Sequence, residues 1–231
     1  AGNYIWRSLV RLVPGLAIAY VIMIVTWPWA ALSPLNPIRG LFSFAEFHYN
    51  IRTVLDGTVY RMATIPRLYV PVYILIKLPL LMLAGAVLAI AFAALPKLAN
   101  ADVPRRQRRE VTLVAFAATF PFLCEVALHC PAFCGLRHFL FVLPPLAILA
   151  GVGLDLLLKS WRNVRMLAPT AMAVILAGFT WNAVTLVRLH PYEYLYYNRL
   201  VGGVHGASRR YVMDYWVGVM PASVAQLAKF L

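Results

Sequence analysis

Long apolar runs constrain this chain more than any other feature of its sequence. Five stretches reach about 20 mostly apolar residues, the length that a helix needs to cross a membrane; they cover 9–31, 72–95, 111–128, 139–158 and 166–187. Hydrophobic residues make up 62% of the 231 residues and charged residues only 13%. A soluble chain of this length could not bury so much apolar surface. The sequence therefore predicts an all-α integral membrane protein with about five transmembrane helices.

Basic residues predict the orientation of these helices, because cytoplasmic loops carry an excess of Lys and Arg. Segment 96–110 holds five basic residues and 159–165 holds three, whereas 129–138 holds only Arg137. We therefore expect the N-terminus inside and the C-terminus outside, with the long segments in the periplasm of a bacterial inner membrane. This divides the chain into an N-terminal span (1–31), an outer loop (32–71), a four-span bundle (72–187) and an outer C-terminal segment (188–231).

The net charge of +13 would suggest a nucleic-acid partner in a soluble chain. In a membrane protein it reflects topology and contact with anionic headgroups, so we expect membrane lipids as partners and no nucleic acid. The two long outer segments are rich in aromatic residues, unlike disordered linkers. Aromatic residues at this density suit the headgroup layer of a membrane.

Three ionisable residues at the predicted span ends are candidates for binding a lipid phosphate. Lys77 lies near the start of the second span, where its ammonium can reach the headgroups. Arg137 and His138 stand where the fourth span begins. The planar guanidinium of Arg matches a phosphate, and a helix N-terminus favours anions. The alternative is that these residues only anchor the protein among the headgroups.

The remaining candidate groups lie in the two outer loops. In an oxidising compartment Cys130 and Cys134 are expected to form a disulfide, although reduced thiols are an alternative. The spacing of His and Cys around them matches no strong zinc pattern, so we expect no metal and no required cofactor; a divalent metal has no support. Glu46 and Asp56 are candidates for a catalytic carboxylate, but no second spacing constraint supports either. Phosphate-binding loops and nucleophile elbows do not occur in the sequence.

Long stretches of the sequence resemble one family of membrane enzymes. Segment 51–79, IRTVLDGTVYRMATIPRLYVPVYILIKLP, resembles the outer loop and following span of bacterial protein-mannosyltransferase-like proteins. These are polytopic C-type glycosyltransferases that include the lipid A aminoarabinose transferases. The elements that carry the resemblance are Pro66, Tyr69, Pro71, Tyr73, Lys77 and Pro79. Segments 137–154 and 190–216 resemble the later part of such proteins.

The resemblance implies transfer of a sugar from a polyprenyl-phosphate donor to an acceptor at the outer membrane face. It implies that Lys77, Arg137 and His138 hold the phosphate. It also implies an acceptor or sugar surface, for which an interfacial aromatic layer is the alternative; its residues are Tyr196, Tyr197, Asn198, Asp214, Tyr215 and Trp216. The family carries its catalytic carboxylate in an N-terminal outer loop of a longer chain, so no residue here inherits that role. We therefore expect either a C-terminal portion or a shortened relative without transferase chemistry.

The alternative function is that of a non-catalytic membrane subunit that packs within a larger complex. Small residues favour close helix packing, and two runs of them occur in the second and fourth spans: Ala84, Gly85 and Ala86, and Ala150, Gly151 and Gly153. These runs serve packing inside an enzyme or a transporter equally well. A transporter is the third hypothesis, but no span has a convincing charge at its midplane.

Overall fold

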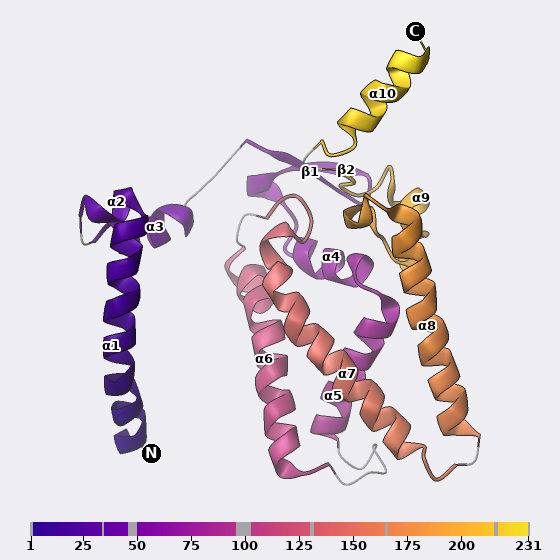
Figure 1. Ribbon diagram of the computed structural model, residues 1–231, viewed down its shortest axis with the longest axis horizontal. Coiled ribbons are helices and arrows are strands. Elements are labelled where there is room, and N and C mark those ends of the chain that lie inside the picture. Colours follow the sequence, from indigo (N-terminus) through magenta and orange to yellow (C-terminus); the bar gives the residue numbers. More distant parts are fainter. Residues whose placement is uncertain are drawn as a thin grey trace. The chain divides into compact units, whose positions relative to one another are not determined.

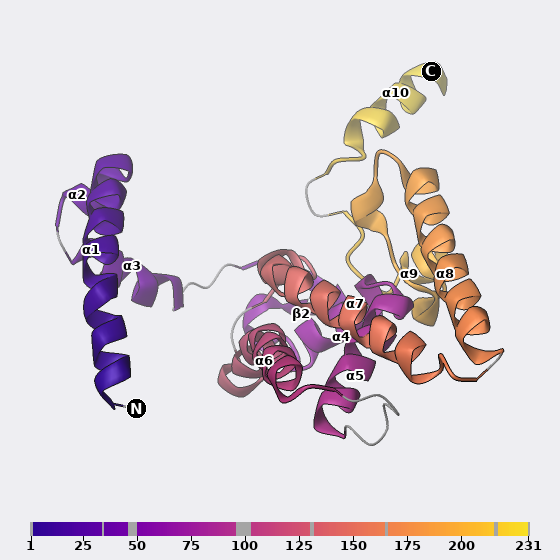
Figure 2. The same cartoon turned by 60° about the horizontal axis from the view of Figure 1, so that its bottom comes forward.

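The computed structural model describes residues 2–33, 35–45, 50–95, 103–129, 132–164, 166–214 and 217–230. The chain divides into two compact units, Ala1–His48 and Tyr49–Leu231. The boundary falls inside the predicted outer loop 32–71. Each unit is described by itself below (Figures 1 and 2).

The described part of the N-terminal unit contains the helices α1 (Gly2–Thr26), α2 (Pro28–Ala31) and α3 (Asn36–Ala45). The Asn36 side-chain amide donates a hydrogen bond to the Trp29 carbonyl at 2.8 Å, which holds α3 against α2. The predicted first span is therefore helical. Its apolar part, Val10–Thr26, is shorter than the helices of the second unit that are long enough to cross a membrane.

Three helices of the second unit are long and apolar enough to cross a membrane. They are α6 (Arg105–Leu128), the segment Arg137–Ser160, which combines η3 (Arg137–Val142) and α7 (Leu143–Ser160) across a kink at Phe139, and α8 (Leu167–Leu189). They agree with the predicted spans 111–128, 139–158 and 166–187. Large apolar side chains such as Phe116, Val174 and Phe179 are exposed on them, as suits contact with lipid. The described chain is thus mostly helical, with three candidate membrane-crossing helices, or four if a bent pair counts as one.

That bent pair replaces the predicted second span. α4 (Tyr69–Lys77) and α5 (Leu80–Ala94) meet at an angle of 113°. Pro79 has no N–H to continue the helix, and its ring disfavours the helical conformation in the residue before it. Leu78 is accordingly extended, with φ −94° and ψ 148°. The prediction of one continuous helix over 72–95 is wrong for this reason.

A β-hairpin departs from the all-α prediction. Its strands, β1 (Arg52–Leu55) and β2 (Thr58–Arg61), pair antiparallel around a two-residue turn, and the short helix η1 (Met62–Thr64) follows. The turn residues Asp56 and Gly57 both have positive φ, the conformation in which Asp-Gly is favoured. The Arg210 guanidinium pairs with the Asp56 carboxylate, and the Arg210 carbonyl accepts from the Gly57 N–H at 2.9 Å. The two predicted outer segments are therefore joined.

The second unit has two distinct ends (Figure 1). At one end lie the end of α5, the start of α6 and the end of α7, and we call this the arginine end. At the other lie α4, the hairpin and segment 190–214, and we call this the hairpin end. Segment 190–214 contains η4 (Glu193–Leu195), η5 (Arg199–Val201) and α9 (Gly203–Ala207), and α10 (Met220–Phe230) comes after it.

Helices α5 and α7 pack with their backbones in contact. A Cβ added to Gly85 would lie 2.6 Å from the Ala150 carbonyl oxygen, and one added to Gly153 would overlap the Gly85 carbonyl oxygen. The predicted close packing is confirmed at these three residues, whereas Gly151 faces open space. Gly85, Ala150 and Gly153 therefore pack against each other within the chain.

We predict that Gly153→Val destabilises the protein and Gly151→Val does not. The new side chain at 153 has to push α5 and α7 apart, and overpacking of this kind typically costs about 1–3 kcal/mol. At 151 the same substitution meets no neighbour within 4 Å. Thermal unfolding of the detergent-solubilised protein measures both variants. Equal melting temperatures would contradict the backbone contact.

Candidate functional site

A pocket of about 340 Å³ opens at the hairpin end, between segments that are far apart in the sequence. Three of the predicted site residues, Lys77, Arg137 and Tyr196, line it together. The other lining residues are mostly apolar and come from α4–α5, segment 134–143, α8 and segments 193–196 and 212–213: Leu78, Pro79, Cys134, Gly135, Leu136, Leu140, Leu143, Asn182, Leu186, Glu193, Tyr194, Val212 and Met213. A cavity with a few polar groups on an apolar wall is typical of a small-molecule site.

Lys77 is the last residue of α4, just before the break at Pro79. Its ammonium donates to the Tyr194 carbonyl at 2.9 Å and lies 3.8 Å from the centre of the Tyr197 ring. Both neighbours are attracted to a cation, but neither carries a negative charge. In the described part of the chain no carboxylate forms an ion pair with Lys77. The positive charge is therefore held in place while remaining uncompensated.

Arg137 begins η3, a short 3₁₀ helix with a kink at Phe139 before α7 begins at Leu143. Its guanidinium contributes a second positive charge to the pocket lining. Beside it, burial raises the pKa of the Cys134 thiol, and the nearby Arg137 charge opposes that shift. His138 turns toward Phe133, with 4.7 Å between the ring centres, and is not among the residues lining the pocket.

The pocket also contains one carboxylate, that of Glu193. A hydrogen bond with its own backbone N–H and another with His190 hold the pKa of this carboxyl below its usual range. The His190 ring nitrogen lies 2.6 Å from the Glu193 oxygen. The charged groups of the lining are thus two cations and one anion, and the anion is already paired.

Asn198 closes the break between α4 and α5. Its side-chain amide donates to the carbonyls of Leu75 and Leu78, at 2.6 and 2.8 Å, and its N–H donates to the Ile76 carbonyl at 2.9 Å. Its own side-chain oxygen accepts from the Leu200 N–H at 3.0 Å. These bonds satisfy carbonyls that the break removes from the regular helix pattern. Asn198 is 2% exposed and is used entirely by the fold.

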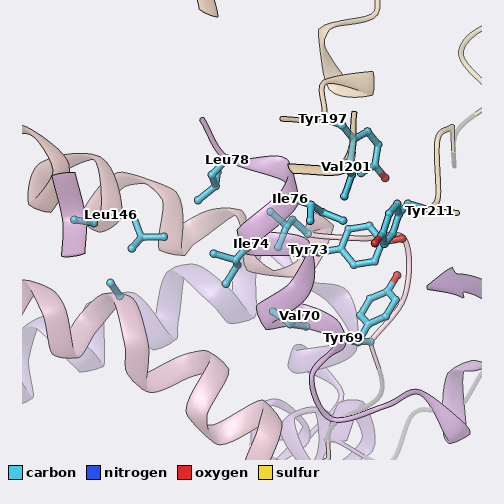
Figure 3. Packing of buried hydrophobic residues seen from close by; sticks show 14 of the residues in the cluster. Tyr69, Val70, Tyr73, Ile74, Ile76, Leu78, Leu146, Tyr197, Val201 and Tyr211 are labelled. Carbon is cyan, nitrogen blue, oxygen red and sulfur yellow. The ribbon is translucent and has the colours of Figure 1, made fainter. Parts of the chain in front are cut away.

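Four tyrosine rings form part of the buried core of the second unit (Figure 3). Ring centres are 4.6 Å apart for Tyr69 and Tyr73, and 5.9 Å apart both for Tyr73 and Tyr211 and for Tyr197 and Tyr211. The Tyr197 hydroxyl donates to the Val212 carbonyl at 2.6 Å. This stack connects α4 with the segments that follow α8.

The tyrosine hydroxyls also fasten the hairpin to α4. Tyr69 shares a hydrogen bond of 2.7 Å with Thr53 and accepts one from the Gly135 N–H at 2.9 Å. Tyr73 donates to the Val54 carbonyl at 2.8 Å. Each buried hydroxyl is thus paired, as buried polar groups must be. The hairpin and the loop before η3 are fixed to one rigid element.

The predicted acceptor surface is not one exposed face. Tyr197 and Asn198 are both 2% exposed and belong to the core. Tyr196 lines the pocket, with its hydroxyl 3.2 Å from the Asn182 side-chain oxygen. Asp214 accepts from the Val219 N–H at 3.0 Å, outside the pocket lining. The predictions for Tyr215 and Trp216 fall outside the described residues.

Of the two candidate catalytic carboxylates, Asp56 does not line the pocket. Asp56 sits in the exposed hairpin turn and is paired with Arg210, which is a structural role. Glu46 lies outside the described residues, and so does Cys130, one half of the predicted disulfide. No group of three or more His, Cys, Asp or Glu that could hold a metal occurs in the described ranges.

Two residues of interest were not predicted as part of the site. Asn182 lines the pocket from α8, and the signal that could have found it is an amide that interrupts the apolar run 166–187. Glu125 is buried near the end of α6, and one of its oxygens has no hydrogen-bond partner among the described residues. It is not one of the residues lining the pocket.

Comparison with known proteins adds no relative. No protein-family model, no curated protein and no solved structure matches the chain. The functional argument therefore depends on the pocket and on the sequence itself.

We predict that Asn198→Ala destabilises the protein strongly. The substitution leaves the Leu75 and Leu78 carbonyls without their donor, and a buried polar group left unpaired costs about 1–3 kcal/mol. Asn182→Ala removes an amide of the same size that accepts one hydrogen bond, from the Tyr196 hydroxyl. We therefore expect a smaller loss of stability for Asn182→Ala. Thermal unfolding in detergent compares the two. A smaller loss for Asn198→Ala than for Asn182→Ala would contradict the role of Asn198 at the break.

Proposed function

We propose that this chain is a glycosyltransferase-like membrane protein that binds a polyprenyl-phosphate sugar in the pocket at the hairpin end. The observation that carries the proposal is the meeting of Lys77 and Arg137 on one apolar-walled pocket. These two cations come from segments 60 residues apart in the sequence. They are two of the three residues that the family resemblance assigns to the lipid phosphate; the third, His138, does not line the pocket.

The chemistry of the pocket suits a phosphate attached to a hydrocarbon chain. A phosphate is attracted to the Lys77 ammonium and the Arg137 guanidinium through charge-assisted hydrogen bonds. The adjoining side chains of Leu140, Leu143 and Leu186 form an apolar wall, against which the first part of a polyprenyl chain can pack. A soluble phosphate would gain nothing from this wall.

In the transfer that the resemblance implies, the acceptor attacks the anomeric carbon of the sugar. The bond between that carbon and the phosphate oxygen breaks, and the polyprenyl phosphate departs with the bonding electrons. Lys77 and Arg137 stabilise the charge that develops on the departing phosphate. A base must take the acceptor's proton, and we assign that base to no residue described here. The proposal of sugar transfer therefore rests on the family resemblance. The proposal of phosphate binding rests on the pocket.

The proposal also includes the location of the chain. We infer about five spans in a bacterial inner membrane, with the arginine end in the cytoplasm and the hairpin end in the periplasm. The excess of Lys and Arg in segments 96–110 and 159–165 supports this orientation. The pocket would then face the outer leaflet.

We predict that Lys77→Met and Arg137→Ala each weaken binding of polyprenyl phosphate by about tenfold. Each substitution removes one charge-assisted contact, and a tenfold change in affinity corresponds to about 1.4 kcal/mol. Binding to the detergent-solubilised full chain can be followed by quenching of its tryptophan fluorescence. Melting temperatures of the variants separate loss of binding from loss of folding.

Lys159→Ala is the matched control for these variants. Its ammonium is paired with Asp155 on α7 and does not line the pocket, so its removal should leave the affinity unchanged. If neither Lys77→Met nor Arg137→Ala changed the affinity, the assignment of these residues to phosphate binding would be wrong. In that case the non-catalytic subunit becomes the better hypothesis.

We also predict that the two ends of the second unit react with thiol reagents from opposite sides of the membrane. In a cysteine-free background, Val59→Cys lies in the exposed hairpin and Arg106→Cys at the exposed start of α6. A membrane-impermeant reagent added to intact cells should label the first variant, and the second only after permeabilisation. Labelling of Arg106→Cys from outside would reverse the proposed orientation.

A further inference from the structure

A second pocket, of about 520 Å³, lies at the arginine end. In the part of the chain that the structure describes, it is lined by Ala93 at the end of α5 and by five residues from the start of α6: Arg105, Arg108, Arg109, Thr112 and Leu113. Three of these six residues carry a positive charge and none is acidic. This pocket is separate from the one at the hairpin end and shares no residue with it.

The helical repeat explains why these arginines meet. Residues three or four positions apart share one face of a helix, so Arg105, Arg108 and Arg109 point to the same side of α6. Arg106 and Glu110 occupy another face, where they form an ion pair of 2.8 Å. Glu110, the one carboxylate in the first two turns of α6, therefore pairs with an arginine outside the pocket lining.

Among the residues that the structure describes, no carboxylate forms an ion pair with the arginines of this pocket. Arg108 donates from Nε to the Ala93 carbonyl at 2.8 Å, which fixes its guanidinium at the end of α5. Within the described ranges neither Arg105, Arg108 nor Arg109 forms an ion pair. Like charges at these spacings repel each other, and the N-terminus of α6 adds further positive potential. An anion in the pocket would relieve this repulsion.

An apolar stripe continues from the pocket along the same face of α6. Leu113, Phe116 and Phe120 follow Arg109 at helical spacing and are all exposed. The two phenylalanine rings lie 4.9 Å apart and form a continuous surface. Cations at one end of such a stripe match an anionic headgroup with its acyl chain, because the chain can lie on the stripe while the phosphate reaches the arginines.

We propose that this pocket binds the phosphate headgroup of an anionic phospholipid. Arg105 and Arg109 contact the phosphate, Arg108 contributes charge from its fixed position, and one acyl chain lies along Leu113 and Phe116. The site requires the chain to lie in a membrane but does not depend on the function proposed for the other pocket.

Lipid retention by the full chain tests the proposal. The protein is purified in detergent with phosphatidylglycerol or phosphatidylcholine of identical acyl chains, and the lipid that stays bound is counted by native mass spectrometry. Phosphatidylglycerol should be retained in about tenfold excess over phosphatidylcholine. Equal retention of the two lipids would overturn the proposal without any variant being needed.

Paired double variants identify the residues. Arg105→Ala with Arg109→Ala should lower phosphatidylglycerol retention about tenfold, whereas Arg106→Ala with Arg162→Ala should change it less than about twofold. Both pairs remove two positive charges, but Arg106 and Arg162 do not line the pocket. Equal loss in the two pairs would mean that net charge alone attracts the lipid.

Competition with inorganic phosphate separates a lipid from a soluble anion. Phosphate in large molar excess should leave phosphatidylglycerol bound, because it lacks the acyl chain that packs on α6. Displacement of the lipid by phosphate at comparable concentration would show a free-anion site and contradict the proposal.

Discussion

The break at Pro79 is the constraint on which the rest of the second unit depends. Proline ends α4, and the carbonyls of its last turn lose their helical partners in a place where membrane surroundings offer little water. Asn198 supplies the missing donors from a segment more than a hundred residues later. α4 can therefore turn away from α5 and end with Lys77 at the pocket. A straight helix over the same residues would carry Lys77 away from the segment that now contacts it.

Both ends of the second unit place cationic side chains in a pocket, but these side chains are held more firmly at the hairpin end than at the arginine end. At the hairpin end the Lys77 ammonium is held by the Tyr194 carbonyl and the Tyr197 ring, so the position of its charge is fixed before a ligand arrives. At the arginine end Arg108 is anchored to the Ala93 carbonyl, and two further arginines occupy exposed positions on α6. Fixed charges favour selection of one ligand geometry. Exposed, long side chains favour a headgroup that varies in orientation.

The sequence predicted what depends on local composition and missed what depends on distant contacts. Apolar runs located α6, α7 and α8, because helices in lipid must be long and apolar. Pro79 is a sequence signal from which the break between α4 and α5 could have been predicted. The dipeptide Asp56-Gly57, between residues that favour strands, is a similar signal for the hairpin. The pairing of Asn198 with α4 had no local signal, since it joins parts of the chain that only the fold brings together. Their charge alone made Lys77 and Arg137 candidates in the sequence. The sequence did not predict that both residues line one pocket.

The contact between Asn198 and α4 has a consequence for biosynthesis. Residues 69–94 leave the ribosome long before residue 198, so the carbonyls at the break have no protein donor while the first helices enter the membrane. Water or lipid headgroups must satisfy them during that time. The pocket forms only when segment 190–214 packs onto α4. The proposed binding site therefore requires the segment that contains Asn198, and truncation before this residue would remove the site although α6, α7 and α8 remain.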